Sequence, residues 1–326
     1  MTSSTIQPLT LDWTETETHL RYSLSDYSLF SLRLVGRTYA VPIAPLLPAT
    51  FKADLEEFLR SAPGNVPLLC IRNLPIEQHV PRLQSVGGRL QYTLNQCYQY
   101  YADLGGNFDQ YLASLSTKTR STLKRKIKKF ASLSGGNVDW RVYTAADQMP
   151  EYHRLAREVA AKTYQERLFN GAIPGDERFR AQISNLAAAN LIRGYLLFLN
   201  GAPIAYLHLP IQDGVVEYAY LGYDPAHAEV SPGSVLLYSA LQDLFAAQQF
   251  SYFDFSYGAG QTKEVFSTAK YLRADVFYFA TSLKHYVAAY SHMALDSTSS
   301  MLGRTLERIN LHTAVKRLLR RTRAAA

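Results

Sequence analysis

The chain has 326 residues, of which 47% are apolar and 19% are charged. A chain of this length and composition can bury a substantial core, which excludes a mainly disordered or fibrous protein. At about 150 residues per domain, we expect two domains or one domain built from two halves. No stretch approaches the roughly 18 apolar residues that a membrane-spanning helix needs.

The two cysteines, Cys70 and Cys97, lack the spacing of metal ligands. We therefore expect no disulfide scaffold and a reducing, cytoplasmic environment. The N-terminus has no basic segment followed by an apolar one, so we expect no secretory signal peptide. The eight histidines are scattered, and we expect no metal site.

The net charge of +7 is unevenly distributed. Residues 118–129 hold seven basic residues and no acidic one, and residues 301–326 hold seven basic residues and one acidic one. The rest of the chain is therefore acidic on balance. Two basic surfaces on an acidic body can attract phosphates, anionic lipid or nucleic acid.

In the first half of the chain the pattern predicts a strand over 28–36, a helix over 51–60 and a buried strand over 66–74. Residues 85–104 indicate mixed strand and turn. A helix is predicted over 116–131, because Leu123, Ile127 and Phe130 form one apolar stripe on a cationic rod.

The strongest pattern follows in the second half. Residues 193–200, 203–211 and 215–224 read as three consecutive antiparallel strands, with turns at Gly201–Ala202 and Asp213–Gly214. A helix begins after Ser231 with Pro232 in its first position, and a strand over 251–258 follows. Two terminal helices are predicted, over 284–297 and 301–323.

The start of the helix at Ser231-Pro232-Gly233-Ser234 suits an anion. The first amides of a helix have no partners within it, and the helix dipole adds a positive potential there. Gly233 has no side chain, so a phosphate can approach the backbone closely. A well-capped helix start without any ligand explains the same residues.

Three strands, a helix whose N-terminus can bind an anion, and a further strand follow one another in the core of the GNAT acyltransferase fold. Four segments are distinctive: YLASLSTKTRSTLKRKIKKF, GAPIAYLHL, YAYLGYDPAHAEVSPGSVLLYSAL and YFDFSYGAGQTKEVFS. On these segments the chain resembles the CelD/BcsL-like branch of GNAT acetyltransferases, which is linked to cellulose and exopolysaccharide synthesis and related to the FemABX peptidyltransferases. The four segments lie within residues 105–285. In ordinary GNAT members, the turn that begins the donor-binding helix ends on a glycine or another small residue, and this chain has Val235 at that position.

The resemblance implies an α/β fold of two GNAT-like halves, with central mixed sheets flanked by helices. We expect a degenerate N-terminal half over 1–114, a C-terminal acyltransferase domain over 115–290 and a basic amphipathic tail over 291–326. The implied reaction is transfer of an acetyl or acyl group to an amine or hydroxyl. Acetyl-CoA or another acyl-CoA is the implied co-substrate, and no permanently bound cofactor is expected.

The donor is expected to lie between the strand around Tyr218–Tyr223 and the strand around Asp254–Ser256. Its pyrophosphate is then expected at the helix start, on the residues Ser231, Gly233, Ser234 and Val235. Chemistry needs a base for the acceptor and a donor for the oxyanion. The candidate catalytic residues are Glu217, His208, Asp254 and Lys263. Each has an ordinary alternative: an exposed strand carboxylate, a structural histidine, and a structural ion pair of Asp254 with Lys263.

Five residues are candidates for substrate binding: Lys118, Arg120, Arg125, Tyr218 and Tyr220. Tyr218 and Tyr220 share a strand face by the period of two, where they can line an acceptor site or simply pack. The acceptor is expected to be a small molecule or saccharide of envelope or exopolysaccharide metabolism. The basic helix over 301–323 can lie on anionic membrane, which would place the protein at the inner membrane, or pack back on the body.

Two other functions remain open. FemABX-like transfer from aminoacyl-tRNA would use the basic helix for tRNA phosphates. A catalytically inactive GNAT fold could instead serve as a binding module at a membrane assembly. A nucleic-acid-binding protein has only charge in its favour, and the chain carries no RNA-reading motif.

Overall fold

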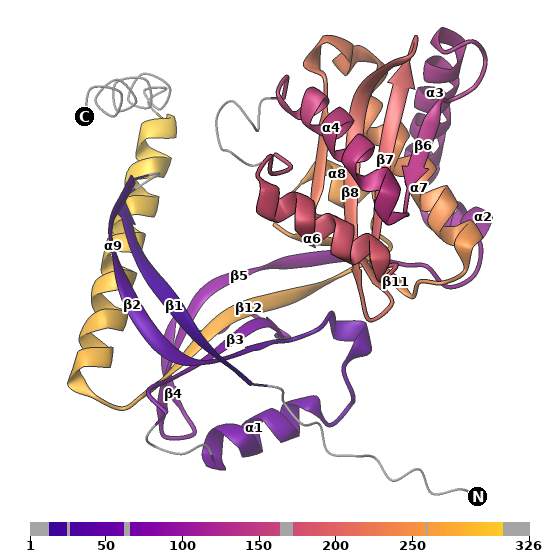
Figure 1. The fold of residues 1–326 in the computed structure, drawn as a ribbon. Coiled ribbons are helices and arrows are strands. Elements are labelled where there is room, and N and C mark those ends of the chain that lie inside the picture. Colours follow the sequence, from indigo (N-terminus) through magenta and orange to yellow (C-terminus); the bar gives the residue numbers. More distant parts are fainter. Residues whose placement is uncertain (1–12, 25–26, 62–65, 164–171, 259, 309–326) are drawn as a thin grey trace, which may run out of the picture. The chain divides into compact units, whose positions relative to one another are not determined.

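The computed structural model describes residues 13–24, 27–61, 66–163, 172–258 and 260–308 (Figure 1). The chain forms two compact units, one made of residues 97–271 and the other of the residues before and after that range. The predicted domains, 1–114, 115–290 and 291–326, do not coincide with these units. The reason is that the chain returns to the first unit after residue 271. That the first unit is a degenerate GNAT half stays a prediction.

The first unit is built on a mixed sheet with the strand order β1-β2-β3-β12-β5, and β4 pairs with β5. β1 and β2 are antiparallel, β2 and β3 are parallel, and β3 and β12 are antiparallel. Strands β5 and β12 continue into the second unit. The strand bounds are β1 Thr14–Leu24, β2 Tyr27–Ala40, β3 Leu68–Pro75, β4 Leu83–Val86, β5 Arg89–Asp103 and β12 Ala269–Ala280.

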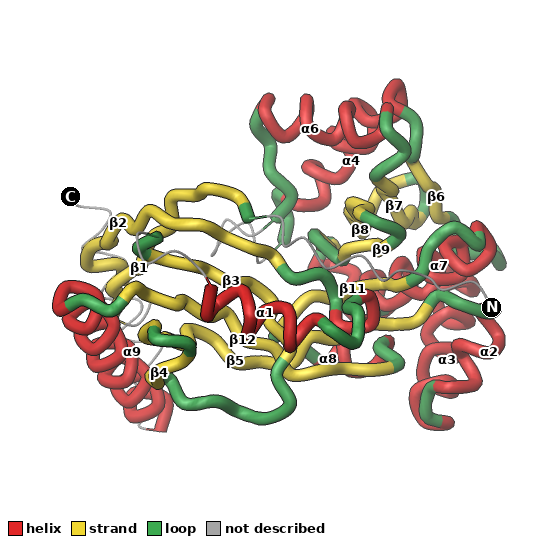
Figure 2. Tube along the Cα trace, turned by 90° about the horizontal axis from the view of Figure 1, so that it is seen from below, coloured by secondary structure: helices red, strands yellow, loops and turns green. Residues whose placement is uncertain are grey.

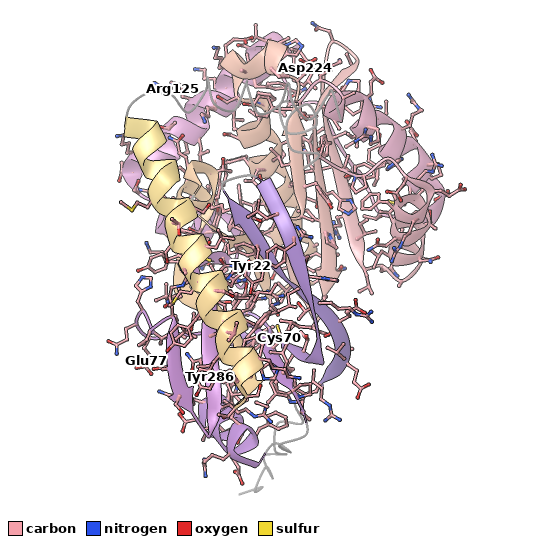
Figure 3. The ribbon with its side chains drawn as sticks, turned by 90° about the vertical axis from the view of Figure 1, so that its left-hand side faces the viewer. Tyr22, Cys70, Glu77, Arg125, Asp224 and Tyr286 are labelled. Atoms are coloured by element: carbon pink, nitrogen blue, oxygen red, sulfur yellow. The ribbon has the colours of Figure 1, made fainter. Side chains whose placement is uncertain are left out.

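Two helices cover the two faces of this sheet (Figure 2). They are α1 (Phe51–Ser61) and α9 (Leu283–Arg308), and a short 3₁₀ helix, η1 (Ala44–Leu46), precedes α1. Side chains alternate along β3, so Leu68 and Cys70 pack toward α9 whereas Leu69 packs toward α1. The Tyr22 hydroxyl donates to the Ala288 carbonyl at 2.9 Å and fixes α9 along β1 (Figure 3).

The second unit carries the predicted three-strand pattern. Its strand order is β5-β11-β9-β8-β7-β6, and β10 pairs with β8. The strand bounds are β6 Trp140–Tyr143, β7 Ile192–Leu199, β8 Ala202–Gln212, β9 Val215–Glu217, β10 Tyr220–Tyr223 and β11 Tyr252–Tyr257. The predicted turn at Asp213–Gly214 is confirmed, with both residues at positive φ. The first turn lies one residue earlier than predicted, at Asn200–Gly201, because these two residues adopt positive φ.

Helices flank this sheet on both faces, as the predicted α/β class requires (Figure 1). Along β8, Leu207 and Leu209 pack into the core beneath α7 and α3, whereas Tyr206 faces the core beneath α4 and α6. The helix bounds are α2 Phe108–Ser114, α3 Thr117–Leu133, α4 Met149–Ala160, α6 Glu177–Ala188, α7 Pro232–Ala247 and α8 Gln261–Phe266, with 3₁₀ helices η2 Ala146–Gln148 and η3 Pro225–Val230. We call the two faces the α7 face and the α4/α6 face.

The C-terminal region differs from its prediction. In place of a break between two terminal helices, α9 runs without interruption from Leu283 to Arg308. Most of the predicted basic helix, residues 309–323, lies outside the described residues. Within the part of the chain that the structure describes, no helix is both long enough and apolar enough to cross a membrane.

Candidate active site

A β-bulge opens the sheet of the second unit between β9 and β10. β9 pairs in parallel with β11, with Glu217 opposite Asp254, and this pairing extends to the Tyr218 amide, which donates to the Asp254 carbonyl at 2.9 Å. Among the described residues β10 then pairs with β8 and not with β11. The pairing register on β8 shifts by one residue between Val216 and Tyr220. The two strands therefore separate where the sequence predicts the donor to lie.

The bulge also separates two tyrosines that the period of two places on one face. Tyr218 packs on the α7 face beside Phe253 and Phe255. Tyr220 contacts Phe179 on the opposite, α4/α6 face. The prediction of a shared face is wrong, because one extra residue in a strand reverses the alternation of every side chain that follows.

The start of α7 has an unusual backbone. Ser231 occupies the N-cap position in the left-handed region, with φ of 54°, and its side chain makes no capping hydrogen bond. The amides of Ser234 and Val235 both donate to the Ser231 carbonyl, at 3.0 and 3.1 Å. This leaves the amide of Gly233, for which no described residue provides a backbone acceptor. Of the amides of Gly233, Ser234 and Val235, that of Gly233 alone thus lacks a backbone acceptor among the described residues.

Lysine side chains from α3 lie against this turn. The Lys126 ammonium donates to the Ser234 hydroxyl at 3.1 Å, and Lys129 donates to the Glu229 carbonyl at 2.9 Å. Burial, and secondarily the charge of Arg125, lowers the pKa of Lys126. A partly buried cation is thereby held beside the positive end of α7, so this position favours an anion more strongly than a helix start alone.

Two cavities meet at the start of α7. One, of about 260 Å³, is lined on the α3 side by Lys118 and Lys126. The other, of about 180 Å³, is lined by Gly233 and by the end of β10. Ser234 and Thr262 line both. A Cβ atom on Gly233 would lie 3.1 Å from the Leu221 side chain, so this glycine keeps the second cavity open.

The predicted basic residues of α3 have different environments. Lys118 is exposed and lines the larger of these two cavities. Arg120 donates to the Ala113 carbonyl at 2.8 Å and to the Thr117 hydroxyl, so it braces the junction of α2 and α3. Arg125 is exposed on α3 (Figure 3) and lines neither cavity.

Two carboxylates lie side by side on the α4/α6 face of the opened sheet. Glu217 and Asp254 occupy paired positions of parallel strands, and their neighbours Val216 and Phe253 point into the α7-face core. Burial, followed by the negative charge of Asp254, raises the pKa of Glu217. A carboxylate with a raised pKa at the point of strand separation is suited to accept a proton.

Asp254 is fixed by hydrogen bonds. Its Oδ1 accepts from the Gln99 side chain at 2.6 Å and from the Ser256 amide at 2.7 Å. Lys263, the predicted ion-pair partner, donates to the Tyr257 carbonyl. Burial lowers the pKa of Lys263, and the negative charge of Asp254 opposes that shift, so the two groups interact.

His208 lies deep on the α4/α6 face. Its side chain is among the aromatic rings of Tyr152, Phe179 and Tyr220. Burial, and secondarily His153, lowers its pKa to about 4, so the imidazole is neutral at physiological pH. A neutral imidazole can exchange a hydrogen bond with a ligand, whereas a base working at neutral pH needs a pKa closer to 7.

Sequence reasoning missed Lys126 and Gln99. In the sequence, Lys126 lies between Leu123 and Ile127 at the edge of the predicted apolar stripe. A lysine at the edge of a buried helix face can reach the neighbouring helix, so this position indicates a contact that sequence reasoning could have used. Gln99 is brought to Asp254 by the pairing of β5 with β11, which no local pattern indicates. Within the described ranges, no group of three or more His, Cys, Asp or Glu residues is arranged to hold a metal ion.

Comparison with known proteins agrees with this geometry. Residues 117–264 match a family model described as "Acetyltransferase (GNAT) domain". This range contains the separated strands, the start of α7 and the basic helix α3. A search of curated proteins gives no significant match.

Solved structures show the same fold over most of the chain. The C-terminal DUF2156 domain of a protein described as a lysylphosphatidylglycerol synthetase from Agrobacterium fabrum is 13% identical, covers 87% of each chain and has a TM-score of 0.50. FemX is 10% identical, covers 84% of this chain and 90% of its own, and also has a TM-score of 0.50. The fold is a mixed α/β fold of the GNAT acyltransferase type.

Proposed function

We propose that this protein is an acyltransferase that moves an acetyl or acyl group from acyl-CoA to an amine or hydroxyl. One observation carries the proposal: the bulged separation of β10 from β11 lies between an anion-binding corner on the α7 face and the Glu217–Asp254 pair on the other face. A thioester that enters along the opening would have its phosphates on one side and its carbonyl beside a base on the other. The match of residues 117–264 to an acetyltransferase domain supports this assignment.

The donor phosphates fit the corner formed by α3 and α7. The Lys126 ammonium supplies a full charge, and the Gly233 amide, the Ser234 hydroxyl and the Thr262 hydroxyl supply donors around the two adjoining cavities. Charge-assisted hydrogen bonds of this kind are stronger than neutral ones. They offset the reduced number of amides at the turn.

The open edge of β10 can hold the thioester carbonyl. The Asp224 amide donates to Ile204 on β8, so the alternation of a strand directs the amides of Leu221 and Tyr223 away from β8 toward the opening. A backbone amide there can bind the oxyanion that forms during transfer.

Glu217 is the proposed base. The acceptor nitrogen or oxygen attacks the thioester carbon, its proton passes to the Glu217 carboxylate, the carbon–sulfur bond breaks and CoA leaves as the thiolate, which is protonated from solvent. The raised pKa of Glu217 makes its carboxylate a better proton acceptor than an ordinary glutamate. Asp254, held by Gln99 and the Ser256 amide, would position the strand end and maintain that pKa.

The finer assignments come from the sequence resemblance. The CelD/BcsL-like branch suggests a saccharide or amino acceptor of cellulose or exopolysaccharide synthesis, in the cytoplasm and at the inner membrane through residues 301–323. Aminoacyl-tRNA is the second candidate donor, because α3 exposes Lys118 and Arg125 beyond the two side chains that contact the α7 turn. An inactive binding module would keep the same fold without donor binding.

The test is calorimetric titration of the full chain with acetyl-CoA. Gly233→Arg fills the smaller cavity and should abolish binding, whereas Ala246→Arg, an exposed position near the other end of α7, should leave it unchanged. Binding that survives Gly233→Arg overturns the site. If no acyl-CoA binds the unmodified protein, the acyl-CoA donor is wrong, and ribonuclease-sensitive transfer from aminoacyl-tRNA becomes the function to measure.

A further inference from the structure

A third cavity lies on the α4/α6 face, apart from the corner assigned to the donor. Its volume is about 370 Å³, within the range of small-molecule pockets. Helix α6 contributes Phe179 and Gln182, its N-cap residue is Asp176, and the sheet contributes His208 and Tyr220. Ala219, within the bulge, also lines it, so the cavity adjoins the strand separation two residues from Glu217.

His208 lines this cavity and carries a polar atom for which the described part of the chain provides no hydrogen-bond partner. Its side chain lies in the cavity wall and is only 3% exposed, yet its Nδ1 has no hydrogen-bond partner among the described residues. A buried polar atom without a partner costs about 1–3 kcal/mol. A ligand that supplies the missing hydrogen bond would recover that cost.

A hydroxyl group fits this requirement best. The imidazole is neutral, and a neutral ring nitrogen is either a donor or an acceptor according to the tautomer. A hydroxyl can satisfy both cases, because it donates and accepts, whereas an ammonium only donates and a carboxylate only accepts.

The cavity walls favour a ring with apolar and polar edges. The rings of Phe179 and Tyr220 are nearly perpendicular, at 88° with centroids 6.1 Å apart, and form an aromatic corner beside His208. Around it stand the planar polar groups of Asp176, Arg178 and Gln182. Asp176 is held in place as the N-cap of α6, where its Oδ1 accepts from the Phe179 amide at 2.9 Å.

We propose that this cavity binds a pyranose ring of the acceptor, with a ring hydroxyl on His208 and the C–H face of the sugar against the aromatic corner. The inference rests on the proposed acyl transfer, and it names a saccharide as the acceptor class. Period two along β8 and β9 places His208 and Glu217 on one face of the sheet. A sugar seated here presents its remaining groups toward the base. His208 is therefore a specificity-determining residue and not a proton acceptor.

The experiment measures binding of methyl N-acetyl-β-glucosaminide and methyl β-glucoside to the full chain by ligand-observed NMR. His208→Phe retains an aromatic ring and removes both nitrogens, and Gln182→Ala alters an exposed residue of the rim. We expect at least one glycoside to bind, and His208→Phe to weaken it by about tenfold or more, the equivalent of about 1.4 kcal/mol. Gln212→Ala, at the exposed end of β8, is the matched control and should have no effect.

Acetyl-CoA titrations of the same samples separate this proposal from the proposed function. Glycoside binding weakened by His208→Phe or Gln182→Ala, with unchanged acetyl-CoA affinity, supports the acceptor pocket. Absence of glycoside binding, or equal affinity in all variants, overturns it while acyl-CoA binding can stand. Glycoside binding without any acetyl-CoA binding would retain the pocket and overturn the acyl-CoA donor.

Discussion

The two faces of the sheet in the second unit differ in charge. On the α7 face, the opening is bordered by Lys118 and Lys126 and by the positive end of a helix. On the α4/α6 face, it is bordered by the Glu217–Asp254 pair and a neutral imidazole. A single β-bulge joins these two environments.

Under the proposed acyl transfer, this difference would keep the two substrates apart. A donor that carries several phosphates is attracted to the cationic face and repelled by the paired carboxylates. A neutral acceptor meets no such repulsion on the other face. The strand separation is then the place where the two can meet, and a substitution on either face should impair one substrate and spare the other.

Removal of the proposed base should have the largest effect. Glu217→Gln keeps the shape of the side chain and eliminates its proton affinity, so we expect turnover to fall by about 10²–10⁴-fold. Acetyl-CoA affinity should be unchanged, because the carboxylate lies on the acceptor face. Glu151→Gln, an exposed carboxylate on α4, is the control and should retain full activity.

The same variant gives a pH signature. Because the base must be ionised, the rate in the unmodified protein should rise with pH across a midpoint above the ordinary glutamate value of 4.5, since the pKa of Glu217 is raised. Glu217→Gln should lose this dependence. If it kept both the rate and the pH dependence, the base would be another group.

The donor side should respond more moderately. Lys126→Ala removes one charged contact to the phosphates, and we expect acetyl-CoA to bind about tenfold more weakly, with a shallower salt dependence. Lys128→Ala, exposed on the same helix, is the matched control. Pantetheine lacks the pyrophosphate, so its affinity should be the same in all three proteins. An equal loss for pantetheine would place Lys126 away from the phosphates.

Local patterns predicted the elements of this unit but not the geometry that makes the site. The hairpin strands β7 and β8 and the start of α7 follow from alternation, turn residues and Pro232, all of which are local signals. The bulge depends on which strand β10 pairs with, so the period of two misplaced Tyr220 relative to Tyr218.

The site residues likewise could be predicted one by one from local patterns, but not their arrangement. Glu217 and Asp254 were found separately, and only the parallel pairing of β9 with β11 makes them a pair. The return of β12 and α9 to the first unit likewise depends on long-range strand pairing. Contacts between segments far apart in the chain cannot be predicted from the residue pattern within one segment.

The smallest effect we predict is on stability, and it tests whether His208 is neutral. Its pKa is about 4 in the folded protein and 6.5 ordinarily, so the unfolded chain binds this proton more tightly. The stability that the neutral ring contributes is therefore present in full above pH 6.5 and is lost as pH falls toward 4, at about 1.4 kcal/mol for each unit of difference in pKa.

Urea unfolding of the unmodified protein and of His208→Phe between pH 7 and pH 4 should show a shallower loss of stability in the variant. Equal slopes would mean that folding does not lower the pKa of His208, and the contrast between a cationic donor face and a neutral imidazole in the acceptor pocket would not hold.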